Sequence, residues 1–365
     1  MAVNETQLVQ LFEQVLTLSK VDASQSVAIL KSHYSDARTV RAATDAALRL
    51  GARVYAVELP AFNHPRAMGN DMTAYCGDTA LTGNLAAQRA LEAADLIVDT
   101  MMLLHSPEQE QILKTGTRIL LAVEPPEVLA RMLPNAEDKA RVLAAAAVLE
   151  QAKLMQVTSA AGSDFRAPLG QYPTVTEYGY ADEPGRWDHW PSGFLFTWPN
   201  EVQAEGVLVL EVGDILLPFK SYARERITLE IEQGFVTRIH GGFEAEYLRE
   251  YMKYFDDPEV YGISHIGWGL QPRASGRLWA CTTRTTACAW THARSTATSC
   301  SPPGRIPKWA ARAKRLAIWT SRCAAATSAS TGKRWWRTGK WWRRRPRACV
   351  GLNRCCQRRG FVLFS

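Results

Sequence analysis

His265 has the surroundings of a residue that lines a binding site. It lies in Y-G-I-S-H-I-G-W-G-L, where glycines let the backbone approach another group closely and a tryptophan can form one wall of a pocket. A histidine packed in the core, with both ring nitrogens hydrogen-bonded, would fit the same sequence. The residue types alone leave both interpretations open.

A second histidine, His105, lies where a parallel sheet usually holds its ligand. It follows the apolar run D-L-I-V-D-T (95–100), and ligands of open parallel sheets bind beyond the carboxyl ends of the strands. An imidazole at that place could act as a general base. The alternative is a histidine of an ordinary surface loop.

The densest group of functional side chains is T-E-Y-G-Y-A-D-E-P-G-R-W-D-H-W-P (176–191). Its acidic, imidazole and aromatic members are Glu177, Tyr178, Tyr180, Asp182, Glu183, Trp187, Asp188, His189 and Trp190. This combination suits a flat, polar aromatic substrate that stacks on rings and is hydrogen-bonded at its edges. A subunit interface rich in tyrosine and tryptophan has the same composition and remains an equal alternative.

Short apolar runs alternate with helical patterns over the first 160 residues, and these elements would position the candidate side chains. We expect strands at 26–31, 54–59, 95–100 and 118–123, and helices at 37–50, 82–94 and from Asn135 to about Met155. Such alternation predicts an α/β fold with a parallel sheet covered on both faces. No glycine-rich phosphate-binding motif follows any of these strands, so the pattern does not support nucleotide binding.

Beyond residue 160 the sequence becomes richer in aromatic residues, glycine and proline. Extended segments are expected at 206–212 and 227–239, with E-Q-G-F (232–235) as a hairpin turn, followed by a helix over 243–255. This pattern predicts a second, β-rich domain.

Charge divides the chain at about residue 274. Residues 1–273 carry 23 Lys and Arg against 36 Asp and Glu, a net charge of −13, whereas residues 274–365 carry 20 Lys and Arg and no acidic residue. The later segment also holds seven of the eight cysteines, without the paired spacing of a zinc site. With Cys76 as its only cysteine and no apolar run long enough to cross a membrane, the first part is expected to be cytoplasmic.

Four long segments of the first part carry a resemblance to a known family. They are L-K-S-H-Y-S-D, V-E-L-P-A-F-N-H-P, A-M-G-N-D-M-T-A-Y-C-G-D-T-A-L-T-G-N and W-D-H-W-P-S-G-F-L-F-T-W-P-N-E. Together they resemble the 2,5-dihydroxypyridine 5,6-dioxygenases of nicotinate and nicotine degradation, and the resemblance extends from residue 1 to Arg273. That family is distantly similar to the M29 type of metallo-aminopeptidase, which gives peptide hydrolysis as the alternative enzyme function.

These patterns together divide the chain into three expected parts. We expect a Rossmann-like α/β domain at 1–160, a β-rich domain that binds metal and substrate at 161–273, and an aberrant, poorly ordered, frame-shift-like basic tail at 274–365 without resemblance to the family. The dense aromatic surface makes a homo-oligomer the expected assembly. We expect no membrane partner.

The resemblance implies Fe(II) as the cofactor, held by two histidines and one carboxylate that leave one face of the metal open. His265 matches the first of these ligands. The family has the other two in a His-Leu-Asp motif nearer the C-terminus, but here no Asp follows Asp257, and His292 is the only histidine after His265. Two of the three implied ligands are therefore missing.

The resemblance also implies roles for four residues that contact the substrate. His105 matches the base that acts on a substrate hydroxyl, beside Leu104 in a mobile loop, and Glu177 and His189 match residues that hydrogen-bond the substrate. The implied reaction adds both atoms of O₂ to 2,5-dihydroxypyridine and opens the ring between C5 and C6, giving N-formylmaleamate.

Three interpretations compete for residues 274–365: a nucleic-acid-binding tail, a disordered extension and translation in a shifted reading frame. Arginine and tryptophan interleave in K-R-W-W-R-T-G-K-W-W-R-R-R-P-R (333–347), a pattern that could contact phosphates and stack on bases. A GC-rich coding sequence translated in a wrong frame would also yield many Arg, Ala, Thr, Cys and Trp residues.

Codons favour the shifted frame. The family's C-H-L-D-I-P can be encoded TGC CAT TTG GAC ATC CCG, and translation one base later gives A-I-W-T-S-R, which is the sequence of residues 317–322. The same shift converts the family's G-N-F-L-F-S into A-T-S-C-S-P, the sequence of residues 297–302. We therefore interpret the tail as frame-shifted, with Ile318 and Thr320 where the second histidine and the aspartate should be, and expect no nucleic-acid partner.

Overall fold

The computed structural model describes residues 2–60, 79–101, 103, 106–216, 219 and 221–274, together with the backbone of 334–337 and 340–343. Leu104 and His105 lie outside the described residues, as do Cys76, Ile318 and Thr320. In the tail, the described strands β16 (Arg334–Arg337) and β17 (Lys340–Arg343) pair antiparallel with each other.

Five parallel strands form the first sheet, in the order β2-β1-β3-β4-β8. They are β1 (Ser26–Lys31), β2 (Arg53–Glu58), β3 (Leu96–Asp99), β4 (Arg118–Leu121) and β8 (Trp187–His189). The strand order reverses between β1 and β3, which is where open parallel sheets bind ligands beyond their carboxyl ends. The expected parallel sheet is confirmed.

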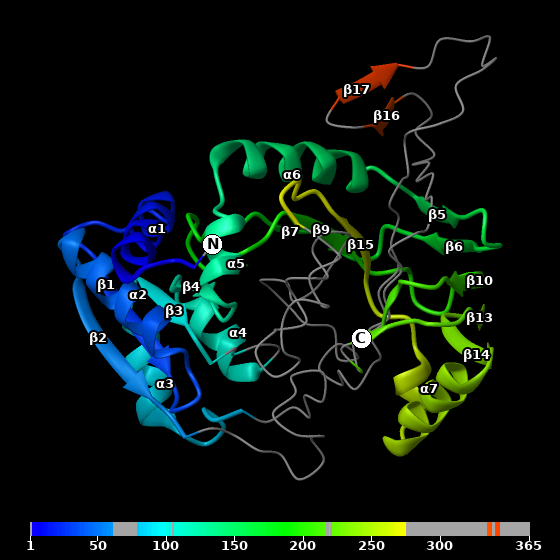
Figure 1. The fold of residues 1–365 in the computed structure, drawn as a ribbon, viewed down its shortest axis with the longest axis horizontal. Coiled ribbons are helices and arrows are strands. Elements are labelled where there is room, and N and C mark those ends of the chain that lie inside the picture. The colour runs from blue at the N-terminus through cyan, green and yellow to red at the C-terminus, as the bar shows by residue number, and fades with distance from the viewer. Residues whose placement is uncertain are drawn as a thin grey trace.

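Helices cover both faces of this sheet, as Figure 1 shows. They are α1 (Glu5–Leu18), α2 (Ala37–Arg49), α3 (Leu85–Glu92), α4 (Pro107–Lys114) and α5 (Pro126–Arg131). Val27 and Ile29 of β1 belong to a core shared with α1 and α2, whereas Ala28 and Leu30 belong to a second core with residues of α3 and α4. Alternate residues of a buried strand thus supply the two cores.

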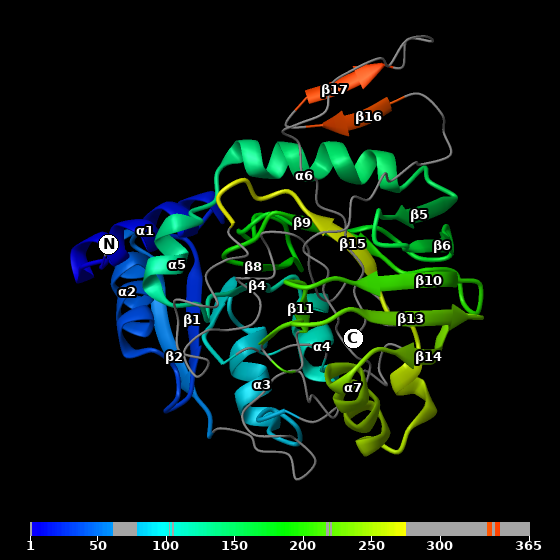
Figure 2. The same ribbon diagram turned by 45° about the vertical axis from the view of Figure 1, so that its right-hand side comes forward.

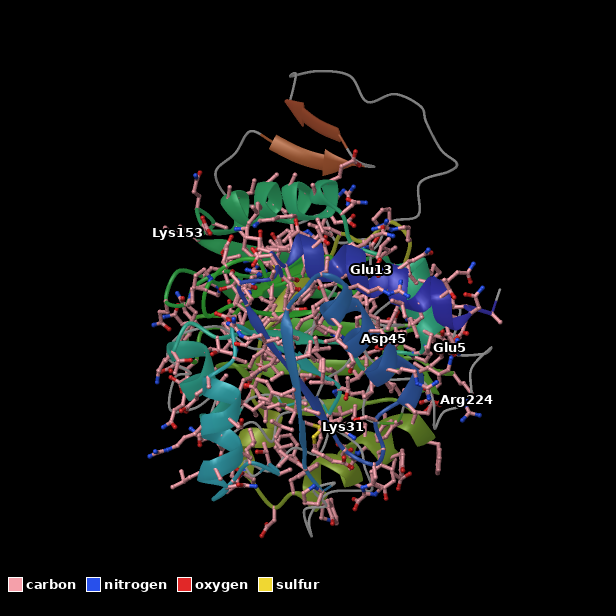
Figure 3. All side chains as sticks on the ribbon, turned by 90° about the vertical axis from the view of Figure 1, so that its left-hand side faces the viewer. Glu5, Glu13, Lys31, Asp45, Lys153 and Arg224 are labelled. Atoms are coloured by element: carbon pink, nitrogen blue, oxygen red, sulfur yellow. The ribbon has the colours of Figure 1, made fainter. Side chains whose placement is uncertain are left out.

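Two ion pairs join α1 to α2 on the outside of the molecule. Arg38 and Arg49 of α2 bind Glu5 and Glu13 of α1 at 2.7 and 3.0 Å, and Figure 3 shows this face with both glutamates labelled. Because these side chains are substantially exposed, each pair contributes about 1 kcal/mol or less. The buried apolar face of α1, which includes Leu8, Phe12 and Leu16, holds the helix to the shared core more strongly than these pairs.

The second sheet is antiparallel, in the order β14-β13-β10-β6-β5. Its strands are β5 (Leu154–Thr158), β6 (Asp164–Pro168), β10 (Glu205–Leu210), β13 (Ile227–Glu232) and β14 (Phe235–His240). The expected hairpin turn is present, with positive φ at Gln233 and Gly234, as a two-residue turn between twisted strands requires. Helix α7 (Phe243–Tyr254) packs beside β14.

A three-stranded sheet, β15-β9-β7, lies between the two larger sheets in Figure 2. Its strands are β7 (Val175–Glu177), β9 (Phe194–Thr197) and β15 (Ile266–Gly269). Helix α6 (Ala136–Leu149) packs across β7 and β9. The remaining described elements are β11 (Ile215–Leu216), β12 (Ser221–Tyr222) and a 3₁₀ turn at Pro258–Tyr261.

The prediction of a helix from Asn135 to about Met155 is wrong at its C-terminal end. Asn135 caps α6 as expected, but the helix ends at Leu149 and β5 begins at Leu154. Met155 and Val157 are buried and their neighbours are half-buried, a period of two that suits a strand.

Two strands cross the division that we expected at residue 160. β5 precedes it and joins the antiparallel sheet, whereas β8 follows it and joins the parallel sheet. One core cluster also includes Ile29 of the parallel sheet and Leu229 of the antiparallel sheet. A domain boundary at residue 160 stays a prediction. Within the described residues, no helix is both long and apolar enough to span a bilayer.

Candidate active site

Glu177 and His265 lie on one face of the three-stranded sheet. Glu177 ends β7 and pairs with Phe194 of β9, so their two side chains leave the sheet on the same side. Phe196 follows on that side, and its ring centroid lies 4.7 Å from that of His265. Glu177 is fully buried and His265 is 3% exposed. The structure therefore buries both candidate side chains on the same face of the three-stranded sheet.

Packing and a hydroxyl group fix the ring of His265 just before β15. The Ser264 hydroxyl lies 3.2 Å from Nδ1 of His265. The rings of Phe196 and Trp198 contact the imidazole, the latter edge-on with centroids 6.1 Å apart. The aromatic wall beside His265 therefore comes from β9 and the residue after it. The expected wall from the tryptophan of the same segment, Trp268, is wrong, because Trp268 pairs with Leu195 and leaves the sheet on the opposite side from Phe196.

His189 ends β8 at the carboxyl edge of the parallel sheet. Asp99, Leu121 and His189 stand in one row across β3, β4 and β8. His189 and Asp99 are both fully buried. Carboxyl ends of parallel strands are the usual place for ligands, so the location agrees with a binding role.

Asp188 joins the segments that carry Glu177 and His189. Its carboxylate, which is fully buried, accepts hydrogen bonds from the backbone N–H groups of Tyr178 (3.1 Å), Gly179 (2.8 Å) and His189 (2.8 Å). Arg186 donates to the same carboxylate from Nε and Nη2, at 3.0 and 2.7 Å. One buried ion pair therefore holds both candidate segments.

Two cations enclose the ring of Tyr178. The guanidinium of Arg186 lies 3.7 Å from the ring centroid and the Nζ of Lys139 lies 4.6 Å from it. The hydroxyl of Tyr178 donates to Asp182 at 2.6 Å, and Lys139 binds the other oxygen of Asp182 at 2.6 Å. Burial raises the pKa of Tyr178, so its hydroxyl stays protonated and serves as a donor.

Opposing effects set the charge of the carboxylates in this network. Burial raises the pKa of Asp188, and the Arg186 guanidinium and the backbone N–H groups of Tyr178 and Gly179 oppose that rise. At Asp182 burial also acts upward, but the hydrogen bonds from Lys139 and Tyr178 outweigh it and lower the pKa.

The described residues on either side of Leu104 and His105 are held by hydrogen bonds. The Asp99 carboxylate accepts from the backbone N–H groups of Met101 (2.8 Å) and Leu103 (2.5 Å), and the Ser106 hydroxyl caps α4. Leu104 and His105 themselves lie outside the described residues. Their proximity to Glu177 and His189 stays a prediction.

The described residues do not fit the three-ligand metal site that the resemblance implies. Across residues 2–60, 79–101, 106–216 and 221–274, no three His, Cys, Asp or Glu side chains gather closely enough to hold a metal ion. His265 is one candidate ligand there. Ile318 and Thr320, which we expect at the positions of the other two, lie outside the described residues, and neither residue type has an imidazole or a carboxylate.

A family model for 2,5-dihydroxypyridine 5,6-dioxygenase (NicX) matches residues 7–299. The chain belongs to this family. A 2,5-dihydroxypyridine 5,6-dioxygenase from Pseudomonas putida is 82% identical over 274 residues, which are 75% of this chain and 78% of the relative. That length is close to the 273 residues that precede the change in composition, although the family model continues further, to residue 299.

A solved structure of a relative agrees with this assignment to the dioxygenase family. The structure of 2,5-dihydroxypyridine dioxygenase from Pseudomonas putida KT2440 superposes with a TM-score of 0.77 at 79% identity, covering 78% of this chain and 82% of that one. Wild-type AmpT from Thermus thermophilus has 15% identity and a TM-score of 0.44, covering 71% and 77% of the two chains. A score at that level carries no argument about this chain.

Sequence reasoning missed the connection between the dioxygenase's candidate residues. Asp188 stood in the dense run, but nothing in the sequence indicated that its carboxylate would bind Tyr178 and Gly179 ten and nine residues away. Arg186 carried no signal beyond its charge. The alternation of side chains in the strand W-D-H is the one available hint, because Asp188 must face away from its neighbours.

Proposed function

We propose that this chain carries the substrate half of a 2,5-dihydroxypyridine 5,6-dioxygenase and lacks the metal half. The observation that supports it is the buried arrangement of Glu177, His189 and His265, with aromatic rings from β9 beside His265 and the Asp188 carboxylate between the first two segments. A flat aromatic ligand with two polar edges suits such surroundings.

Each candidate residue has a role in this proposal. Glu177 and His189 hydrogen-bond the substituents of 2,5-dihydroxypyridine, and His105, next to Leu104, takes a proton from a hydroxyl group. The overall reaction consumes one substrate and one O₂ and gives one N-formylmaleamate, so that both oxygen atoms enter the product.

The cofactor of the proposed reaction is Fe(II), and this chain is proposed to hold it poorly. Non-haem iron sites of this type need two histidines and a carboxylate fixed on one face of the metal. His265 is one such ligand, while Ile318 and Thr320 replace the other two. We therefore infer that the chain binds the aromatic substrate but opens its ring slowly or not at all.

Substrate binding by this chain tests the proposal directly. In anaerobic calorimetry with 2,5-dihydroxypyridine, Glu177→Gln should weaken binding by roughly 10- to 150-fold. This is the change in affinity expected when a hydrogen bond to a charged group, worth about 1.5–3 kcal/mol, is lost. Glu183→Gln is the control, because Glu183 lies in the same dense run with a side chain 57% exposed. No binding by the parent chain, or equal affinities for it and Glu177→Gln, would argue against the substrate half.

Location and assembly complete the proposal. We propose a cytoplasmic enzyme of nicotinate and nicotine degradation, because residues 1–273 have a single cysteine and no apolar run of membrane length. We also propose a homo-oligomer, because α7 exposes Phe243, Tyr247 and Tyr254 at 76%, 51% and 57%.

A further inference from the structure

The two residues proposed to hydrogen-bond the substrate belong to different sheets. Glu177 ends β7, which pairs with β9, whereas His189 ends β8, which pairs with β4. Hydrogen bonding within a sheet therefore does not set the position of one relative to the other. A pocket that distinguishes similar aromatic ligands needs its polar groups held within about half an ångström.

Arg186 and Asp188 fix the backbone on both sides of Glu177. Nη2 of Arg186 donates to the carbonyl oxygen of Thr176 at 2.6 Å, and the Asp188 carboxylate accepts from the N–H of Tyr178 at 3.1 Å. The preceding and following peptide groups are thus both held by one ion pair.

The same ion pair holds His189. Asp188 precedes His189 in β8 and its Oδ1 accepts from the His189 N–H at 2.8 Å, while Oδ2 binds Arg186. The Asp188 side chain is fully buried and that of Arg186 is 10% exposed. Water competes little for these contacts, so they are stronger than the same contacts at a surface.

We propose that Arg186 and Asp188 are positioning residues that hold Glu177 and His189 in one arrangement, and thereby give the pocket its preference for a pyridine ring hydroxylated at both positions. This inference rests on the proposed function, because it takes Glu177 and His189 as the residues that bind the substrate.

The planar guanidinium of Arg186 is suited to this role. It donates to Thr176 and Asp188 in different directions and stacks on the ring of Tyr178, which a compact lysine ammonium cannot do at once. Lys139 offers a matched comparison, since it covers the same ring but donates its hydrogen bonds to Asp182 and Glu183. Loss of Lys139 should therefore leave the pocket's geometry in place.

The first measurement is amide hydrogen exchange in the full chain, followed by NMR. Asp188→Asn and Arg186→Lys should speed amide exchange at Tyr178, Gly179 and His189 by roughly tenfold or more. A tenfold change corresponds to a loss of about 1.4 kcal/mol. Lys139→Gln should leave these three amides within about twofold. Arg186→Lys keeps the positive charge, so it carries the test if Asp188→Asn does not fold.

The second measurement compares the affinity for 2,5-dihydroxypyridine with the affinities for pyridines that carry one hydroxyl group. A general loss of folding stability would lower all of these affinities together and leave their ratio unchanged. In anaerobic calorimetry, the parent chain should prefer 2,5-dihydroxypyridine over 2-hydroxypyridine and 3-hydroxypyridine by roughly tenfold or more. Arg186→Lys should reduce that preference to within about threefold, because all three ligands then meet a loosened pocket. Lys139→Gln should keep the preference of the parent.

Each result decides a separate point. Unchanged exchange in both variants of the ion pair, or an equal loss of preference in Lys139→Gln, would overturn the positioning role. If the parent chain binds none of the three pyridines, the proposed function fails. In that event, the exchange rates still decide whether Arg186 and Asp188 fix the two segments.

Discussion

Buried polar side chains and their hydrogen-bond partners hold the candidate site together. Asp188, Glu177 and His189 are fully buried, and burying such groups costs free energy unless partners compensate for it. Arg186 and the backbone N–H groups around Glu177 provide this compensation for Asp188. Removal of one partner should therefore cost more than a typical surface substitution.

Asp182 should make the folded protein more sensitive to acid. Its pKa is lowered in the folded chain, so its contribution to the free energy of unfolding is complete above the unfolded value of about 3.9 and is lost as pH falls through the lower folded value. Asp182→Asn should destabilise the protein by roughly 1–3 kcal/mol at neutral pH. It should also flatten the decline of stability below about pH 4.

Urea unfolding at several pH values measures this effect. Glu183→Gln is the control, because it removes a second carboxylate that contacts Lys139 but is 57% exposed. We expect its stability curve to follow that of the parent. A parallel decline for Asp182→Asn and the parent between about pH 5 and 3 would show that Asp182 does not have a lowered pKa.

Residue types in the sequence indicated the candidate residues but not what holds them. The density of acids, imidazole and rings predicted a site at 176–191, and the structure buries Glu177 and His189 there. The Arg186–Asp188 contacts depend on how β7 and β8 approach each other from different sheets. No local sequence pattern predicts how these two strands are placed relative to each other.

At the scale of elements, local signals located the regular segments well. The run S-V-A-I-L-K is β1 to the residue, and E-Q-G-F forms the expected turn between β13 and β14. The short strands β7, β8 and β15 were not predicted, because three or four residues give too little periodicity. These three strands position Glu177, His189 and His265, so the site could not be assembled from the sequence.

Asp99 should control the order of the segment after β3. Asp99→Asn replaces one of the carboxylate oxygens that bind the N–H groups of Met101 and Leu103. Exchange of at least one of these amides should become roughly 10- to 150-fold faster, since hydrogen bonds to charged groups contribute about 1.5–3 kcal/mol. NMR hydrogen exchange measures these rates. The Ile119 N–H, which donates to the carbonyl oxygen of Arg186 just before β8, is the unaffected reference.

Two patterns of exchange rates would contradict the proposed role of Asp99. Equal rates in the parent and in Asp99→Asn at both amides would mean that other contacts hold the segment. Faster exchange at Ile119 as well would mean that the substitution loosens the whole sheet rather than the segment leading to His105.

The chain combines two segments of different charge and composition. Residues 1–273 have a net charge of −13, whereas residues 274–365 have a net charge of +20. The match to the dioxygenase from Pseudomonas putida, at 82% identity, covers 274 residues. The change in composition alone located the boundary between the two segments. The comparison of codons indicated a shifted reading frame as its origin. Fold class and family followed from the sequence because long periodic segments and long motifs are informative, but a missing metal ligand is visible only against the family's pattern.

Oxygen consumption tests the central claim most directly. The chain as written and a form with the family's reading frame restored after Arg273 would be purified without oxygen, supplied with Fe(II) and 2,5-dihydroxypyridine, and then exposed to O₂. We predict ring cleavage by the restored form and a rate lower by more than about 100-fold in the chain as written, since two of the three ligands that the proposal requires are absent from it. Equal rates in the two forms would contradict the claim that residues beyond Arg273 must supply the missing ligands.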